Sequence, residues 1–217
     1  MVGQDLPVQI LRPFGPRILH TQIPQEYVNE LNNECDDILK DEQKRKDLDE
    51  SHELVGHVSE ELKCDMHKPK LRLFGEFLCE LAKCLHKEYM KEKFVNETID
   101  TYKLDVHSSW FVRSFETDYN PTHFHTNGTL SCVAYLKVPK GIGLKNTKNT
   151  KENYTTEGYI DFIYGGNAVL TSGNMCVMPV VGDIFIFPTH LFHTVYPFFG
   201  DGERRSFSAN MSLTREV

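Results

Sequence analysis

Gly182-Asp183-Ile184-Phe185-Ile186-Phe187-Pro188 leads directly into Thr189-His190-Leu191-Phe192-His193. A Gly-Asp turn, an apolar run and a Pro-Thr break predict a short strand, with another strand beginning at His193. Short apolar runs of this kind follow one another after about residue 100. Such closely spaced strands are typical of a β-sandwich or barrel, not of alternating parallel units. The expected strands are 109–115, 129–138, 159–164, 174–179, 184–187, 193–197 and 205–213.

The first hundred residues have a different pattern. After a short strand at 8–11, apolar residues recur at helical spacing behind Pro24 and again within 70–94. The first stripe is Val28, Leu31, Cys35 and Ile38, and the second is Phe74, Phe77, Leu78, Leu81 and Leu85. We therefore expect a helical support region over 1–100 and a β core over 101–217, together in one compact domain.

The bulk composition narrows the class of protein. The chain has 217 residues, a net charge of −7 and no apolar run long enough to span a membrane. An acidic chain is a poor non-specific binder of nucleic acid. The six cysteines form no C-x-x-C pair, and the N-terminus has no signal-peptide pattern, so we expect reduced thiols and a cytoplasmic location.

Three histidines are candidate metal ligands. His123 and His125 stand at positions i and i+2, which on a strand places both side chains on one side. His193 is expected on a later strand of the same sheet and would complete the set. Such a face is typical of non-haem iron oxygenases, where a carboxylate usually replaces one histidine. The first pair is also compatible with surface histidines or a zinc site, and His190 is a rival to His193.

Arg204 and Ser206 form a second candidate group. They also stand at i and i+2, so a guanidinium and a hydroxyl share one strand face. A guanidinium fork binds carboxylates in a bidentate way, and a hydroxyl beside it can donate as well. Arg205 points to the other face and is expected to be structural. A surface ion pair is the alternative role for Arg204.

These motifs together resemble the 2-oxoglutarate- and Fe(II)-dependent oxygenase superfamily, above all a prolyl-hydroxylase-like group found in marine bacteria and their phages. The resemblance runs from about Trp110 to Met211. Its elements are Asn120 to His125, Leu130-Ser131, Tyr135 to Pro139, Gly182-Asp183, Phe187-Pro188, His193 and Glu203-Arg204-x-Ser206-x-Ser208-x-Asn210.

The resemblance implies a double-stranded β-helix, which is a jelly-roll, cupin-like fold. It implies that His123 and His193 bind iron and that Arg204, Ser206 and Tyr135 bind the distal carboxylate of 2-oxoglutarate. Ser131 shares a strand face with Tyr135 and is a further candidate for this cosubstrate, whereas a core aromatic is the alternative role for Tyr135. The cofactors would be Fe(II), 2-oxoglutarate and O2, with ascorbate as a further candidate. No catalytic residue beyond the metal ligands is expected.

One departure concerns the usual His-x-Asp, which here reads His123-x-His125. His125 would then be the third ligand, unless Asp183, Asp161 or Asp118 supplies a carboxylate. The expected function is hydroxylation of a C–H bond in a peptidyl or small-molecule substrate, with peptidyl proline first by analogy. A non-catalytic metal- or sugar-binding jelly roll and a nucleic-acid demethylase are the alternatives. Location would be the host cytoplasm if the chain is phage-encoded.

The polar segment 140–156 is rich in Gly, Lys, Asn and Thr. A long polar loop inside a compact domain often has a functional role, and we interpret this one as a lid over the mouth of the site. A passive surface insertion is the alternative.

Overall fold

The computed structural model describes residues 8–11, 15–51, 56–92, 102–143, 156–166, 169 and 172–215. The expected lid falls mostly on residues 144–155, which lie outside the described residues.

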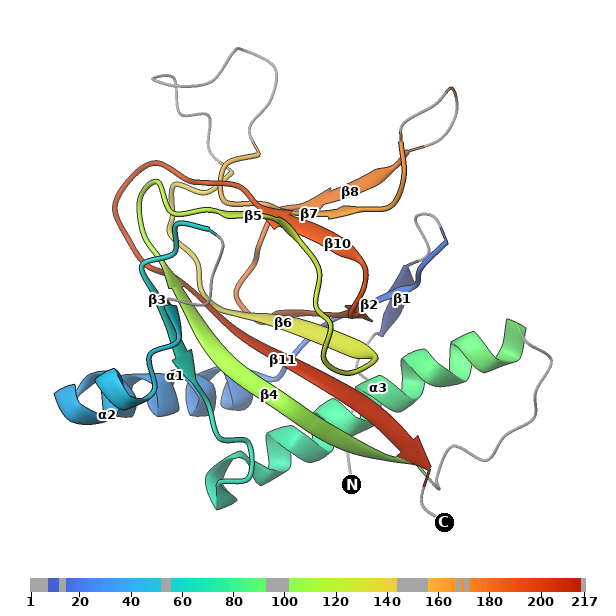
Figure 1. Cartoon of the computed structure of the whole chain (residues 1–217), viewed down its shortest axis with the longest axis horizontal. Coiled ribbons are helices and arrows are strands. Elements are labelled where there is room, and N and C mark those ends of the chain that lie inside the picture. Colours follow the sequence, from blue (N-terminus) through green and yellow to red (C-terminus); the bar gives the residue numbers. More distant parts are fainter. Residues whose placement is uncertain are drawn as a thin grey trace.

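Two antiparallel sheets face each other in the β half of the molecule (Figure 1). The larger sheet has the order β1-β2-β9-β6-β11-β4-β3 and the smaller one β5-β10-β7-β8. The strands are β1 Gln9–Leu11, β2 Ile18–Gln22, β3 Glu60–Lys63, β4 Tyr102–Ser114, β5 Asn120–His123, β6 Leu130–Lys137, β7 Ile160–Ile163, β8 Asn174–Val177, β9 Asp183–Pro188, β10 Phe192–Val195 and β11 Arg204–Arg215. The predicted double-stranded β-helix is confirmed.

Apolar side chains fill the space between the two sheets. Phe162 from β7 and Phe185 and Phe187 from β9 are at most 2% exposed, and they pack with Val133 and Tyr135 of β6. Burial of such large side chains contributes roughly 1.5–3 kcal/mol each. This core makes the barrel a packed scaffold on which the polar residues of one end can be held in place.

The helices cover the outer face of the larger sheet (Figure 1). They are α1 Gln25–Leu39, α2 Glu42–Asp47 and α3 Arg72–Glu92, with a short 3-10 turn η2 at Pro69–Leu71. Both predicted apolar stripes are confirmed, because every one of their residues is at most 4% exposed and belongs to the core between helices and sheet. Pro24 immediately precedes α1, as expected of a residue that suits a helix start.

The first hundred residues also contribute strands to the larger sheet: the expected strand at 8–11 is present as β1, whereas β2 and β3 were not predicted. β2 pairs with β9 through Leu19–Ile186, and β3 pairs with β4 through Leu62–Phe111. The division at residue 100 stays a prediction, but elements from both sides of it share one hydrogen-bonded layer. β3 thereby brings N-terminal residues next to the barrel interior.

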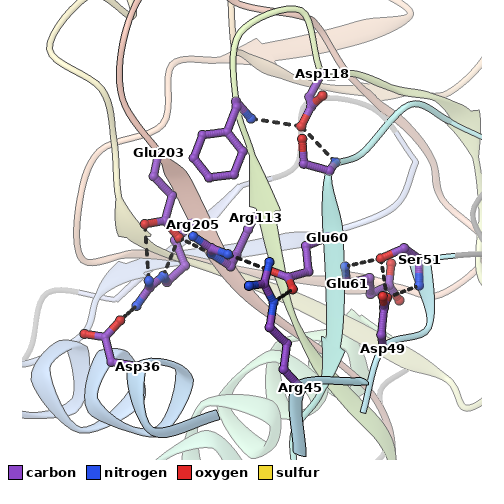
Figure 2. Close-up of polar contacts among 12 residues, drawn as sticks. Asp36, Arg45, Asp49, Ser51, Glu60, Glu61, Arg113, Asp118, Glu203 and Arg205 are labelled. Carbon is purple, nitrogen blue, oxygen red and sulfur yellow. Dashed lines mark hydrogen bonds and ion pairs between the residues drawn. The ribbon is translucent and has the colours of Figure 1, made fainter. Parts of the chain in front are cut away.

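A chain of alternating charges ties the helices to the sheet (Figure 2). Arg113 on β4 pairs with both Glu60 on β3 and Glu203, the latter at 2.6 Å. Arg205 on β11 donates to Glu203 at 2.8 Å and to Asp36 of α1 at 2.7 Å. Burial alone would raise the pKa of Glu203, but hydrogen bonds from Arg205 and Arg113 lower it to about 2. The network therefore stays charged at neutral pH.

All six cysteines are free thiols, in agreement with the reduced state expected. No helix in the described part of the chain is both long and apolar enough to cross a membrane.

Candidate active site

The three predicted histidines meet at one end of the two sheets. β5 pairs with β10 so that His123 lies opposite His193, and His125 follows two residues after β5 ends. The ring centroids of His123 and His193 are 4.2 Å apart, and the Nε2 atoms of His125 and His193 are 3.3 Å apart. One nitrogen from each ring lies within 4.8 Å of the others. Such a cluster can hold a single metal ion.

Backbone carbonyl groups orient two of the rings. His123 Nδ1 lies 2.7 Å from the Pro121 carbonyl oxygen, and His193 Nδ1 lies 3.0 Å from that of Leu191. A carbonyl oxygen only accepts, so both Nδ1 atoms carry the proton and both Nε2 atoms keep the lone pair. This is the tautomer that a metal site requires.

The histidines are held in the uncharged form. Burial lowers the pKa of His125 to about 4 and that of His193 to about 3, with the charge of His123 as a further cause in both. Burial also lowers the pKa of His123, against the hydrogen bond that its ring donates to the Pro121 carbonyl oxygen, which raises it. At neutral pH the three rings are therefore neutral and able to act as ligands.

The carboxylates considered as alternatives are engaged elsewhere. Asp183 lies 3.0 Å from His20 Nε2, Asp161 accepts from Asn174 at 3.0 Å, and Asp118 accepts from the backbone N–H of Ser59 at 2.8 Å. Within the described residues, the candidate metal-binding group consists of the three histidines and contains no carboxylate. His190 is exposed and outside the cluster.

A cavity of about 540 Å³ connects the histidines to Arg204. Arg204 is 5% exposed, and its Nη1 donates to the Gly158 carbonyl oxygen at 3.1 Å. Its Nε atom has no hydrogen-bond partner among the described residues, and it forms no ion pair there. Burial lowers the pKa of Arg204. A buried guanidinium without a directly bound carboxylate is costly, so an anionic ligand in this cavity would stabilise it.

Tyr135 and Ser206 line the same cavity beside Arg204. The two residues are directly paired between β6 and β11, and Arg204 and Ser206 share one face of β11 as predicted. The Tyr135 hydroxyl is fully buried and without a partner among the described residues. Burial raises the pKa of Tyr135 to about 12, so the hydroxyl remains a donor. Arginine, tyrosine and serine together match the hydrogen-bonding needs of one carboxylate.

The pairing of β6 with β11 contains a β-bulge, which changes the side of the sheet to which the end of β6 points. Tyr135 is paired with Ser206 but Lys137 with Arg205, so Leu136 is an additional residue in β6. Tyr135 faces the cavity and Leu136 the helix–sheet core by ordinary alternation, and because of the additional residue Lys137 lies on the helix side as well, where it reaches Glu203 at 3.2 Å.

Ser131 lies apart from Arg204. Its hydroxyl donates to Asn210 Oδ1 at 2.8 Å, and Asn210 is six residues further along β11 than Arg204. Asn210 in turn approaches His125 Nδ1 at 3.5 Å. Neither Asn210 nor Trp110, whose ring centroid lies 5.7 Å from that of His125, was predicted as a site residue. The alternation Arg204-x-Ser206-x-Ser208-x-Asn210 could have indicated Asn210, since all four residues line the cavity.

The comparisons with known proteins agree with this geometry. Residues 108–210 match the family model described as "Putative 2OG-Fe(II) oxygenase". No curated protein matches the chain in sequence.

Solved structures show the same fold at low sequence identity. A prolyl-4-hydroxylase from Pseudomonas putida is 13% identical, with 98% of this chain and 94% of that chain covered and a TM-score of 0.53. SnoK, a non-haem α-ketoglutarate-dependent carbocyclase from nogalamycin biosynthesis, is 15% identical, with 92% and 81% covered and a TM-score of 0.59. A prolyl hydroxylase from Trichoplax adhaerens, in complex with a peptide of a hypoxia-inducible factor, is 8% identical, with 95% and 84% covered and a TM-score of 0.54.

The family model, the double-stranded β-helix and the histidine cluster beside a buried arginine lead to one assignment. Residues 108–210, which include all three histidines and Arg204, match the 2OG-Fe(II) oxygenase family, and this match supports an iron-dependent dioxygenase that uses 2-oxoglutarate and O2.

Proposed function

We propose that His123, His125 and His193 bind the Fe(II) ion and that Arg204, Ser206 and Tyr135 bind the distal carboxylate of 2-oxoglutarate. The observation that supports this most is the pair of unpartnered buried donors, Arg204 Nε and the Tyr135 hydroxyl, in the cavity that also contains the histidines. Both atoms need an acceptor, and the protein supplies none among the described residues.

The bound iron and 2-oxoglutarate would supply oxidative decarboxylation to succinate coupled to insertion of oxygen into a C–H bond. The protein's own residues have simpler tasks. The histidines provide neutral nitrogen ligands, and Arg204 fixes the orientation of the cosubstrate by charge and fork geometry. Val133, Ile160 and Phe187 line the cavity with apolar surface, which limits the access of water.

The primary substrate would enter from the side of β3 and β4. Ser206 on β11 is paired with Val112 on β4, and Val112 is paired with Glu61 on the edge strand β3. Val112 and Glu61 both line the cavity. Phe124, which also lines it, is 47% exposed and stacks edge-to-face with Phe192 at 5.1 Å. Exposed aromatic rings suit a proline-containing peptide. We propose peptidyl proline as the first substrate to test, supported by the prolyl hydroxylases of the same fold.

The proposal is tested in two steps. Purified protein is incubated in air with Fe(II) and 2-oxoglutarate, and succinate is measured; the Arg204→Ala variant is the control and should lose succinate release at low 2-oxoglutarate. A library of proline-containing peptides is then screened by mass spectrometry for the gain of one oxygen atom. Succinate release without any modified peptide would retain the oxygenase but reject peptidyl proline, in favour of a small-molecule substrate.

A further inference from the structure

The third histidine differs from the other two in what controls its tautomer. The Nδ1 atoms of His123 and His193 face the carbonyl group two residues earlier in the chain. The Nδ1 atom of His125 instead faces the side-chain amide of Asn210, with Nδ2 at 3.5 Å. A carbonyl group can only accept a hydrogen bond, whereas an amide can donate or accept. The proton position on His125 is thus the one that a side chain can select.

Asn210 is itself held by a hydroxyl group. Ser131 lies directly opposite Asn210 in the pairing of β6 with β11, and its Oγ donates to Asn210 Oδ1 at 2.8 Å. Asn210 is 6% exposed and Ser131 2% exposed. A serine hydroxyl can donate to an amide oxygen or accept from an amide nitrogen, so it satisfies Asn210 in either orientation of the amide.

We propose that Asn210 is a positioning residue that sets the tautomer of His125 through rotation of its amide, with Ser131 as the partner that permits both orientations. This inference rests on the metal site of the proposed function. With Nδ2 toward His125, Nδ1 accepts, and the ring proton is on Nε2, from where it can donate to His193 Nε2 at 3.3 Å. With Oδ1 toward His125, the ring proton is on Nδ1 and Nε2 offers its lone pair to the metal.

The exchange balances without a net proton. The His125 ring loses a proton at Nε2 and gains one at Nδ1, while the amide turns over and Ser131 changes from donor to acceptor. In each orientation the Asn210 amide has a partner on both sides, and in the second the metal takes the place of His193 as the partner of His125 Nε2, which avoids the cost of an unsatisfied group. Metal binding should therefore turn the amide, and the amide should in turn influence metal affinity.

Three variants separate orientation from packing. Asn210→Asp places oxygen toward His125 in every orientation and should bind Zn(II) at least as tightly as the wild type. Asn210→Leu provides no acceptor and should bind Zn(II) roughly 10–100-fold more weakly, as is typical when an outer-shell partner of a ligand is lost. Ser131→Ala keeps the Asn210 amide but removes the hydroxyl that holds it, so Zn(II) affinity should fall roughly 2–10-fold. Affinities are measured by competition with a chromophoric chelator.

Nitrogen NMR of the labelled full-length protein gives a readout independent of activity. In the wild type, the proton of His125 should move from Nε2 to Nδ1 when Zn(II) is added, whereas in Asn210→Asp it should be on Nδ1 throughout. Wild-type affinity in Asn210→Leu, or a proton on Nδ1 of wild-type His125 before and after Zn(II), would overturn the inference. Failure of the wild type to bind Zn(II) more tightly than His123→Ala would overturn the metal site as well.

Discussion

Arg204 and Arg205 are neighbours in the chain, yet their guanidinium groups lie on opposite sides of the larger sheet. Arg204 points into the cavity and donates to the Gly158 carbonyl oxygen, whereas Arg205 pairs with Glu203 and with Asp36 of α1. The two side chains are about equally buried, at 5% and 1% exposed. They are therefore a matched pair for separating cosubstrate binding from stability.

Arg204→Ala should weaken 2-oxoglutarate binding by roughly 1.5–3 kcal/mol, because a charge-assisted contact with the carboxylate is lost. Calorimetry on the metal-loaded protein measures this. Arg205→Ala should lower the free energy of unfolding by about 3–5 kcal/mol, since Glu203 and Asp36 lose a buried partner. Its folded fraction should bind 2-oxoglutarate nearly as well as the wild type. Equal losses of affinity in both variants would contradict the assignment of Arg204.

Tyr135→Phe should affect binding and stability in opposite directions. The Tyr135 hydroxyl is buried without a partner among the described residues, so its removal should raise the free energy of unfolding by up to about 1 kcal/mol. The same change should weaken 2-oxoglutarate binding by roughly 0.5–1.5 kcal/mol, because one donor to the carboxylate is lost. Urea unfolding without ligand and calorimetry with ligand give the two values. A decrease in stability would indicate that the hydroxyl has a protein partner.

Substitution of each clustered histidine by Ala should lower Fe(II) affinity by more than the 10–100-fold typical of outer-shell changes. Asp183→Ala should leave it unchanged, because that carboxylate is bound by His20 and Gln22. Metal content after anaerobic dialysis is the measurement. Full affinity in His125→Ala combined with its loss in Asp183→Ala would replace the three-histidine site by one with a carboxylate.

Metal binding at pH 6.5 should release few protons. Ordinary histidines have a pKa near 6.5 and would be half protonated there, so three of them would release about 1.5 protons. Burial lowers the pKa of His125 to about 4 and of His193 to about 3, so these rings have no proton to lose. Calorimetry in two buffers of different ionisation enthalpy gives the number of protons released per metal ion bound, and we expect fewer than about 0.5. A value near 1.5 would show that the rings are not desolvated.

Glu203→Gln should change how stability depends on pH. The Glu203 carboxyl has a folded pKa of about 2, below the value near 4.3 of an unfolded chain. Its charge thus contributes stability above about pH 4.3, and this contribution is lost as the pH falls toward 2. The wild type should exceed the variant by roughly 3 kcal/mol at pH 6, with the difference shrinking below pH 4. Urea unfolding over this range is the test, and a constant difference would refute it.

Much of the site could be predicted because strand periodicity carries the information. Residues two apart on a strand share a face, so the opposite directions of Arg204 and Arg205 follow from sequence alone. His123 and His125 also converge, as predicted, although His125 lies beyond the end of β5 and the two do not share a strand face. The apolar stripes of α1 and α3 likewise follow from helical spacing. The structure brings His193 into the same cluster, which spacing could only suggest.

The missed features depend on pairing between distant segments. β2 and β3 are short, and nothing in their local composition shows that β9 and β4 will be their partners. Ser131 was grouped with Tyr135 by strand face, yet its hydroxyl meets Asn210, because register between β6 and β11 decides its neighbours. Alternation along one strand cannot supply that register.

The position of β11 has a consequence for how the chain folds. β11 leaves the ribosome after the other strands of the larger sheet, yet it lies inside that sheet between β6 and β4. Until it arrives, β1-β2-β9-β6 and β4-β3 are two separate ribbons with unpaired edges. Pairings between such distant segments close slowly, and open edges attract other chains. Synthesis that stops before residue 204 should therefore yield aggregation-prone fragments, and refolding should be limited by the insertion of β11 between β6 and β4.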